Sequence, residues 1–131
     1  MIKILDIYAG WLAFTIKKHY FCVSYLDDFK YEMDYLLGIG ENNVYEDNAI
    51  IARAITLDGE GTELKLSITK HQYEDDFLLN WWIDDQRPIT MIFDYKKFIK
   101  SYQEEMDKVK DIYKEKFLME REEDEGYFSE I

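Results

Sequence analysis

The stretch "WLAFTIKKHYFCVSYLDDF", residues 11–29, predicts how the chain begins to fold. Apolar residues alternate with small or polar residues on both sides of Lys18 and His19, which is the pattern of two half-buried strands. We expect the chain to reverse at this point into an antiparallel hairpin. The predicted apolar pairs are Leu12 with Tyr25, Phe14 with Val23, and Ile16 with Phe21.

A short helix is predicted directly after this hairpin. Asp27 or Asp28 can cap it, because an aspartate side chain accepts a hydrogen bond from an unpaired amide of the first turn. Apolar residues then recur at helical spacing until Gly38, which suits the left-handed residue that follows many helices. We expect a helix over residues 28–37.

Two further hairpins follow in the middle of the chain. The sequence "DGEG" at 58–61 separates two alternating runs, and we expect an apolar row of Ile51, Ile55 and Leu57 against Leu64, Leu66 and Ile68, interrupted by Arg53. The runs on either side of 84–88 form the third hairpin. Its predicted pairs are Ile83 with Ile89, Trp81 with Met91, and Leu79 with Phe93. This register places Trp82 on the opposite face, beside Asn80 and Asp84.

The apolar period changes to that of a helix after Asp94, which predicts an amphipathic helix over residues 95–119. Lys3–Tyr8 is an additional first strand, separate from or continuous with the next. The predicted fold is therefore α+β, with a mainly antiparallel sheet in the order ββαββββα and the long C-terminal helix packed on it. We expect one domain over residues 1–119 and a flexible acidic tail over 120–131.

Charge is the main departure from average composition. The chain of 131 residues has 28 acidic and 16 basic residues and a formal net charge of −12. Such a field repels nucleic acid and anionic membranes and speeds association with basic proteins, although acidity also serves solubility. One cysteine excludes an internal disulfide. We see no leader and no apolar run long enough for a membrane span, and we expect a cytoplasmic protein.

No sequence motif indicates an enzyme or a cofactor. The glycines do not form a phosphate-binding loop. His19 and His71 lack partners at metal-ligand spacing, and Cys22 has no histidine nearby in sequence to act as its base. The carboxylate pairs fall at the ends of elements, where acidic residues usually cap helices or face water. We expect a non-enzymatic protein without metal or cofactor.

A binding role rests on acidic and aromatic side chains. Trp82 lies on the less apolar strand face, where it is either covered by a helix or exposed as an anchor for a partner. The candidate partner-binding residues are Asp27, Asp28, Glu74, Asp75, Asp76, Trp82, Asp84 and Asp85.

The N-terminal third also resembles a family. The order "DIYAGWLAFTI", then "FCVSYLDD" and a short apolar helix, resembles small acidic bacterial proteins of the toxin-immunity type. The resemblance covers residues 6–37 and is carried by Gly10, Trp11, Ser24, Tyr25, Leu26 and Asp28. It implies an immunity protein that neutralises a basic toxin domain, such as a nuclease, and it transfers no catalytic residue.

Other functions remain open from sequence. An acidic chain can imitate the phosphate backbone of DNA, which requires evenly spaced carboxylates along an extended surface. An enzyme with an unrecognised acid pair requires a cleft that joins two carboxylate clusters. A structural or regulatory module is a further alternative. The oligomeric state is also open, and an exposed strand edge offers one route to a dimer.

Overall fold

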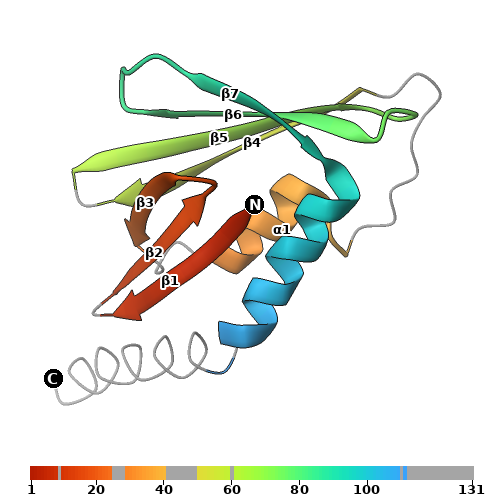
Figure 1. Ribbon diagram of the computed structural model, residues 1–131. Coiled ribbons are helices and arrows are strands. Elements are labelled where there is room, and N and C mark those ends of the chain that lie inside the picture. Colours follow the sequence, from red (N-terminus) through yellow and green to blue (C-terminus); the bar gives the residue numbers. More distant parts are fainter. Residues whose placement is uncertain (9, 25–28, 41–49, 60, 110, 112–131) are drawn as a thin grey trace, which may run out of the picture.

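The computed structural model describes residues 1–8, 10–24, 29–40, 50–59, 61–109 and 111. They form an α+β fold of two antiparallel sheets, with two helices packed against them (Figure 1). The predicted order ββαββββα is confirmed, with the additional first strand separate from the second. The elements are β1 (Ile2–Tyr8), β2 (Trp11–Ile16), β3 (His19–Ser24), α1 (Phe29–Leu37), β4 (Ile50–Gly59), β5 (Thr62–His71), β6 (Asp76–Ile83), β7 (Ile89–Asp94) and a C-terminal helix over residues 95–109.

The three-stranded sheet has the order β1-β2-β3. Its β2–β3 hairpin confirms the predicted faces but not the predicted register. Phe14 pairs with Phe21 and Ile16 with His19, so the connection is the two-residue turn Lys17-Lys18 instead of a four-residue loop. Lys17 takes a positive φ of 53°, which a two-residue turn often requires. The slip is of two residues, and the same side chains therefore remain on the buried face.

The four-stranded sheet has the order β4-β5-β6-β7. In the β4–β5 hairpin, Leu57 pairs with Leu64 and Ile55 with Leu66, as predicted, whereas Ile51 lies opposite Lys70 and Arg53 opposite Ile68. The hairpin reverses within "DGEG", and Gly61 there has a φ of 78°. Positive φ is readily adopted by glycine, which explains why this turn could be predicted from sequence.

The β6–β7 register differs from the prediction by two residues. Trp81 pairs with Ile89, Leu79 with Met91 and Phe77 with Phe93. Ile83 instead lies opposite Leu64 of β5. Asp84 extends that pairing, because its amide donates to the Glu63 carbonyl oxygen at 3.0 Å. The chain therefore returns to β7 through a longer connection than predicted.

One hydrophobic core joins the two sheets and the helices. Phe14 of β2 lies 5.1 Å, ring centre to ring centre, from both Phe21 of β3 and Phe29 of α1. Phe21 in turn meets Trp81 of β6 edge to face at 5.7 Å. This chain of rings runs from α1 through the three-stranded sheet to the inner face of the four-stranded sheet.

Both predicted helices are present in the described residues. α1 ends before Gly38, whose φ is 71°, as expected for a residue that terminates a helix. The C-terminal helix buries Phe98, Tyr102 and Met106. The hydroxyl of Tyr102 donates to Asp34 Oδ1 at 2.9 Å and so ties the two helices together. The predicted continuation to residue 119 and the tail 120–131 lie outside the described residues.

Candidate functional site

The candidate site is the outward side of the four-stranded sheet. Its inward side chains fill the core, and the three-stranded sheet and both helices lie on that inner side (Figure 1). No described helix or strand lies over the other side. We call this side the outer face. Its residues are Ala52, Ala54, Thr56, Asp58, Glu63, Lys65, Ser67, Thr69, Leu78, Asn80, Trp82, Thr90 and Ile92.

The register arranges the outer face in rows that cross the strands. The middle row is neutral and contains Ala54, Ser67, Asn80 and Thr90. The Thr90 hydroxyl donates to Asn80 Oδ1 at 2.5 Å, so these side chains are held in place. The next row toward the β5–β6 turn contains Ala52, Thr69, Leu78 and Ile92. This part of the surface is uncharged, although the chain has a net charge of −12.

Trp82 lies in the row on the other side of the middle row, where it is paired with Lys65 of β5. The indole is partly exposed and lines an open pocket of about 650 Å³. The pocket residues are Lys65, Ser67, Asn80, Trp82, Asp84, Asp85, Gln86 and Pro88. This confirms the expected position of Trp82 beside Asn80 and Asp84. Among the described elements none covers the indole, so the alternative in which a helix covers it is not supported here.

Three carboxylates form a row beyond Trp82. Asp58 pairs with Glu63 across β4 and β5, and Asp84 lies on the other side of Glu63. We call Asp58, Glu63 and Asp84 the acidic row; Asp85 follows it in the pocket. Like charges opposite each other in a sheet are destabilising. The row therefore carries electrostatic repulsion that a cationic partner would relieve.

Backbone geometry fixes Asp84 in this row. Its φ is 49°, a left-handed conformation that aspartate tolerates better than most residues. Its Oδ1 accepts a hydrogen bond of 2.9 Å from the Glu63 amide, while its own amide donates to the Glu63 carbonyl. The Asp84 side chain thus has a structural role in holding the end of β6 against β5, in addition to its charge.

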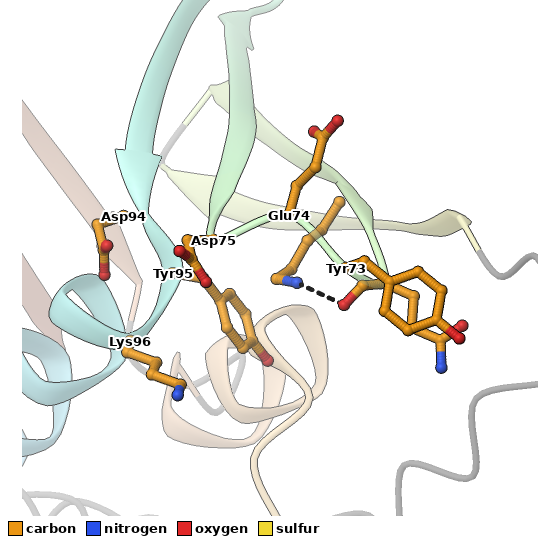
Figure 2. Close-up of a pocket in the computed structure, with 8 residues that line it drawn as sticks. Tyr73, Glu74, Asp75, Asp94, Tyr95 and Lys96 are labelled. Carbon is orange, nitrogen blue, oxygen red and sulfur yellow. Dashed lines mark hydrogen bonds between the residues drawn. The ribbon is translucent and has the colours of Figure 1, made fainter.

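A second cavity, of about 450 Å³, lies at the opposite end of the sheet (Figure 2). Its lining includes Lys70, Gln72, Asp75, Asp94 and Tyr95, and Figure 2 shows Glu74 directed away from Tyr95. Asp94 caps the C-terminal helix, because its Oδ1 accepts a 2.9 Å hydrogen bond from the Lys97 amide.

Lys70 is the unusual residue of this cavity. It is 7% exposed, and its ammonium donates to the carbonyl oxygen of His71 at 3.0 Å and lies 5.2 Å from the centre of the Tyr95 ring. The Tyr95 hydroxyl donates to the Leu37 carbonyl at 2.5 Å. These contacts hold the β5–β6 turn against the start of the C-terminal helix and the end of α1. We therefore assign the residues around this cavity a structural role.

The predicted partner-binding residues fall into separate groups. Trp82, Asp84 and Asp85 lie together at one end of the four-stranded sheet, whereas Glu74, Asp75 and Asp76 lie at the other. The two groups are roughly 25 Å apart along β6, given about 3.3 Å per residue. Asp27 and Asp28 lie outside the described residues. Sequence reasoning missed Asp58 and Glu63, although a hairpin centred on "DGEG" already places them opposite each other.

Other classes of site find no support in the part of the chain that the structure describes. It contains no group of three or more histidine, cysteine, aspartate or glutamate side chains arranged to hold a metal ion. Cys22 is a free thiol and is partly buried. Within the same residues, no helix is both long and apolar enough to span a membrane.

Comparison with known proteins adds no further information on function. The chain matches no family model, no curated protein and no solved structure.

Proposed function

We propose that this protein is a non-enzymatic binding protein whose outer face receives a basic protein partner. One observation carries the proposal: a sheet face without cover from the described elements presents the partly exposed Trp82 beside the acidic row and Asp85. A tryptophan of this kind is typical of the residues that dominate protein interfaces.

The charge of the molecule supports a basic partner. The net charge of −12 attracts cationic proteins over a distance of about a Debye length, and the acidic row gives that attraction a place on the surface. A basic partner also relieves the repulsion among Asp58, Glu63 and Asp84.

In its most specific form, the proposal is that the protein is an immunity protein. Enzymes that cleave nucleic acids bind phosphate with basic surfaces. An acidic face with an aromatic anchor is complementary to such a surface and can cover it. The resemblance of residues 6–37 to toxin-immunity proteins supports the same class of partner.

The distribution of carboxylates does not favour imitation of DNA. Double-stranded DNA carries a charge about every 1.7 Å along its axis. Here the acidic row and the Asp76–Asp94 pair lie at opposite ends of the outer face, with the row of Lys65 and Trp82 and two uncharged rows between them. The same separation argues against a catalytic cleft that joins the two acidic groups.

Co-expression tests the proposal. The tagged chain is expressed with each neighbouring open reading frame of its source genome, and co-purification and growth are measured. We expect a basic, toxic neighbour to form a stable complex and to lose its toxicity. Trp82→Ser should weaken that complex at least about 30-fold, in line with the loss of a central aromatic anchor.

Tyr73→Ser is the matched control, because Tyr73 is an exposed aromatic residue at the opposite end of the four-stranded sheet. It should leave binding unchanged. Equal loss of binding in both variants, or no loss in either, would show that the outer face is not the interface. An acidic or uncharged partner would contradict the proposed charge complementarity.

A further inference from the structure

β7 forms a free edge of the four-stranded sheet. It pairs with β6 on one side, and no described strand pairs with it on the other. The opposite edge strand, β4, is flanked by β3 and α1. In the described part of the chain, β7 is therefore the edge of the four-stranded sheet that is open to another strand.

Two hydrogen bonds reveal which backbone groups face this open edge. The Tyr95 amide donates to the Asp75 carbonyl at 2.8 Å, in register with the β6–β7 ladder. Backbone groups alternate in direction along a strand, so Phe93 and Met91 also face β6. The groups of Thr90 and Ile92 then face outward. The Asp84–Glu63 hydrogen bond supports the same assignment, because it shows which backbone groups along β6 face β5. The alternate groups of β6 then face β7.

The middle of the edge lacks the features that usually prevent pairing. Natural sheet edges are protected by lysine, proline, charged side chains or β-bulges. Pro88 precedes β7 and Asp94 ends it, but residues 89–93 between them include none of those side chains, and β7 pairs with β6 without a shift in register. Ile92 is 62% exposed and Ile89 is 41% exposed. Such an edge is suited to β-strand addition, in which main-chain hydrogen bonds supply affinity.

The charge of the whole molecule favours a basic occupant. Asp84 and Asp85 precede the strand, and Asp76 and Asp94 lie opposite each other at its end. Arg87, Lys96 and Lys97 also flank the strand, so the charges beside it do not by themselves exclude a second copy. Each copy carries a net charge of −12, however, and two copies therefore repel each other as a whole. A basic strand meets no such repulsion.

We propose that an extended basic segment of the partner adds a fifth strand to this sheet along β7. The added strand exchanges hydrogen bonds with the backbone of Thr90 and Ile92, and alternate side chains extend the outer face beside Ile92. This inference rests on the proposed function, and it specifies how the partner engages the same surface.

Ile92→Pro tests whether a strand pairs along the free edge of β7. It removes no hydrogen bond between β6 and β7, because the amide that it deletes faces outward. Proline is tolerated at such positions of edge strands. Ile92→Thr is the matched control, since it shortens the side chain and retains the amide. Thermal unfolding checks that both variants are folded.

The probe is an eight-residue peptide with two lysines at each end and alternating valine and threonine between them. The same peptide with glutamate for lysine is its control. Binding is followed by NMR titration and amide hydrogen exchange at low salt. We expect the lysine peptide to bind with a dissociation constant below about 1 mM and to protect the Thr90 and Ile92 amides. Ile92→Pro should weaken it at least about tenfold, equivalent to about 1.4 kcal/mol, and Ile92→Thr less than about threefold.

Several results would overturn the inference: no binding of the lysine peptide, equal binding of the glutamate peptide, or unchanged binding to Ile92→Pro. Protection of the Ile92 amide in the absence of peptide, together with dimerisation, would identify a second copy as the occupant. If Trp82→Ser abolishes partner binding while Ile92→Pro leaves it intact, the proposed function stands and strand addition fails. If neither variant affects the partner, both fail.

Discussion

Phe21→Ala should test whether one core unites the two sheets. Phe21 is 4% exposed, and its ring contacts Phe14 within the three-stranded sheet and Trp81 in the four-stranded sheet. Removal of a buried phenylalanine side chain costs about 3–5 kcal/mol, which combines lost burial with the cavity that remains. Each aromatic pair contributes about 0.5–1.5 kcal/mol beyond the burial of its surface.

This cost corresponds to a measurable loss of thermal stability. With an unfolding entropy of about 2.1 cal/mol/K per residue, a chain of this length should unfold about 11–18 °C lower. Tyr20→Ala is the matched control, because Tyr20 is the adjacent residue of β3, faces the opposite side and is 58% exposed. It should cost less than about 1 kcal/mol and lower the unfolding temperature by less than about 4 °C.

Thermal and urea unfolding, followed by tryptophan fluorescence and far-UV circular dichroism, provide the assay. We expect one transition that coincides for both signals. Equal losses in Phe21→Ala and Tyr20→Ala would refute the assignment of Phe21 to the contact between the sheets. Two separate transitions in the unsubstituted protein would refute a single core.

Further predictions concern the helix cap, the contact between the helices and the acidic row. Asp94→Ala should cost about 1 kcal/mol of unfolding free energy by urea denaturation, and Asp94→Asn should recover most of it because it retains the capping oxygen. Tyr102→Phe should cost about 1.5–3 kcal/mol by the same assay, since its hydroxyl donates to the Asp34 carboxylate. Glu63→Gln should raise stability by a few tenths of a kcal/mol while weakening the partner complex in calorimetry. Asp84→Asn should slow association in stopped-flow experiments and reduce its salt dependence, and it should leave the fold intact because asparagine still accepts from the Glu63 amide.

Strand faces could be predicted from the sequence, whereas registers could not. The alternation of Leu12, Phe14 and Ile16 identified the buried face of β2, and a two-residue slip retains that face. The slips arise at turns that contain Lys17 and Asp84 at positive φ. These residues adopt that conformation less readily than glycine, so the sequence contained no strong signal for either turn.

The division into two sheets was also beyond sequence reasoning. Period-two alternation is the same whether seven strands form one sheet or two. The contact that packs the two sheets against each other, between Phe21 and Trp81, joins residues that are far apart in the chain.

The candidate site was predicted in part. The position of Trp82 beside Asn80 and Asp84 followed from alternation along one strand. The acidic row depends on cross-strand neighbours in three strands, of which the β4–β5 pairing could have been predicted from "DGEG". The distance between Trp82 and the Glu74–Asp76 group could be obtained only from the course of β6, because they lie at the two ends of that strand.

Partner binding at the outer face is tested directly by amide hydrogen exchange of the protein, free and bound to its co-expressed basic partner. We expect slower exchange in β6, β7 and the 84–88 connection, with β1–β3 and the C-terminal helix unchanged. Protection confined to β1–β3 or to that helix, with β6 and β7 unchanged, would contradict a partner-binding role for the outer face.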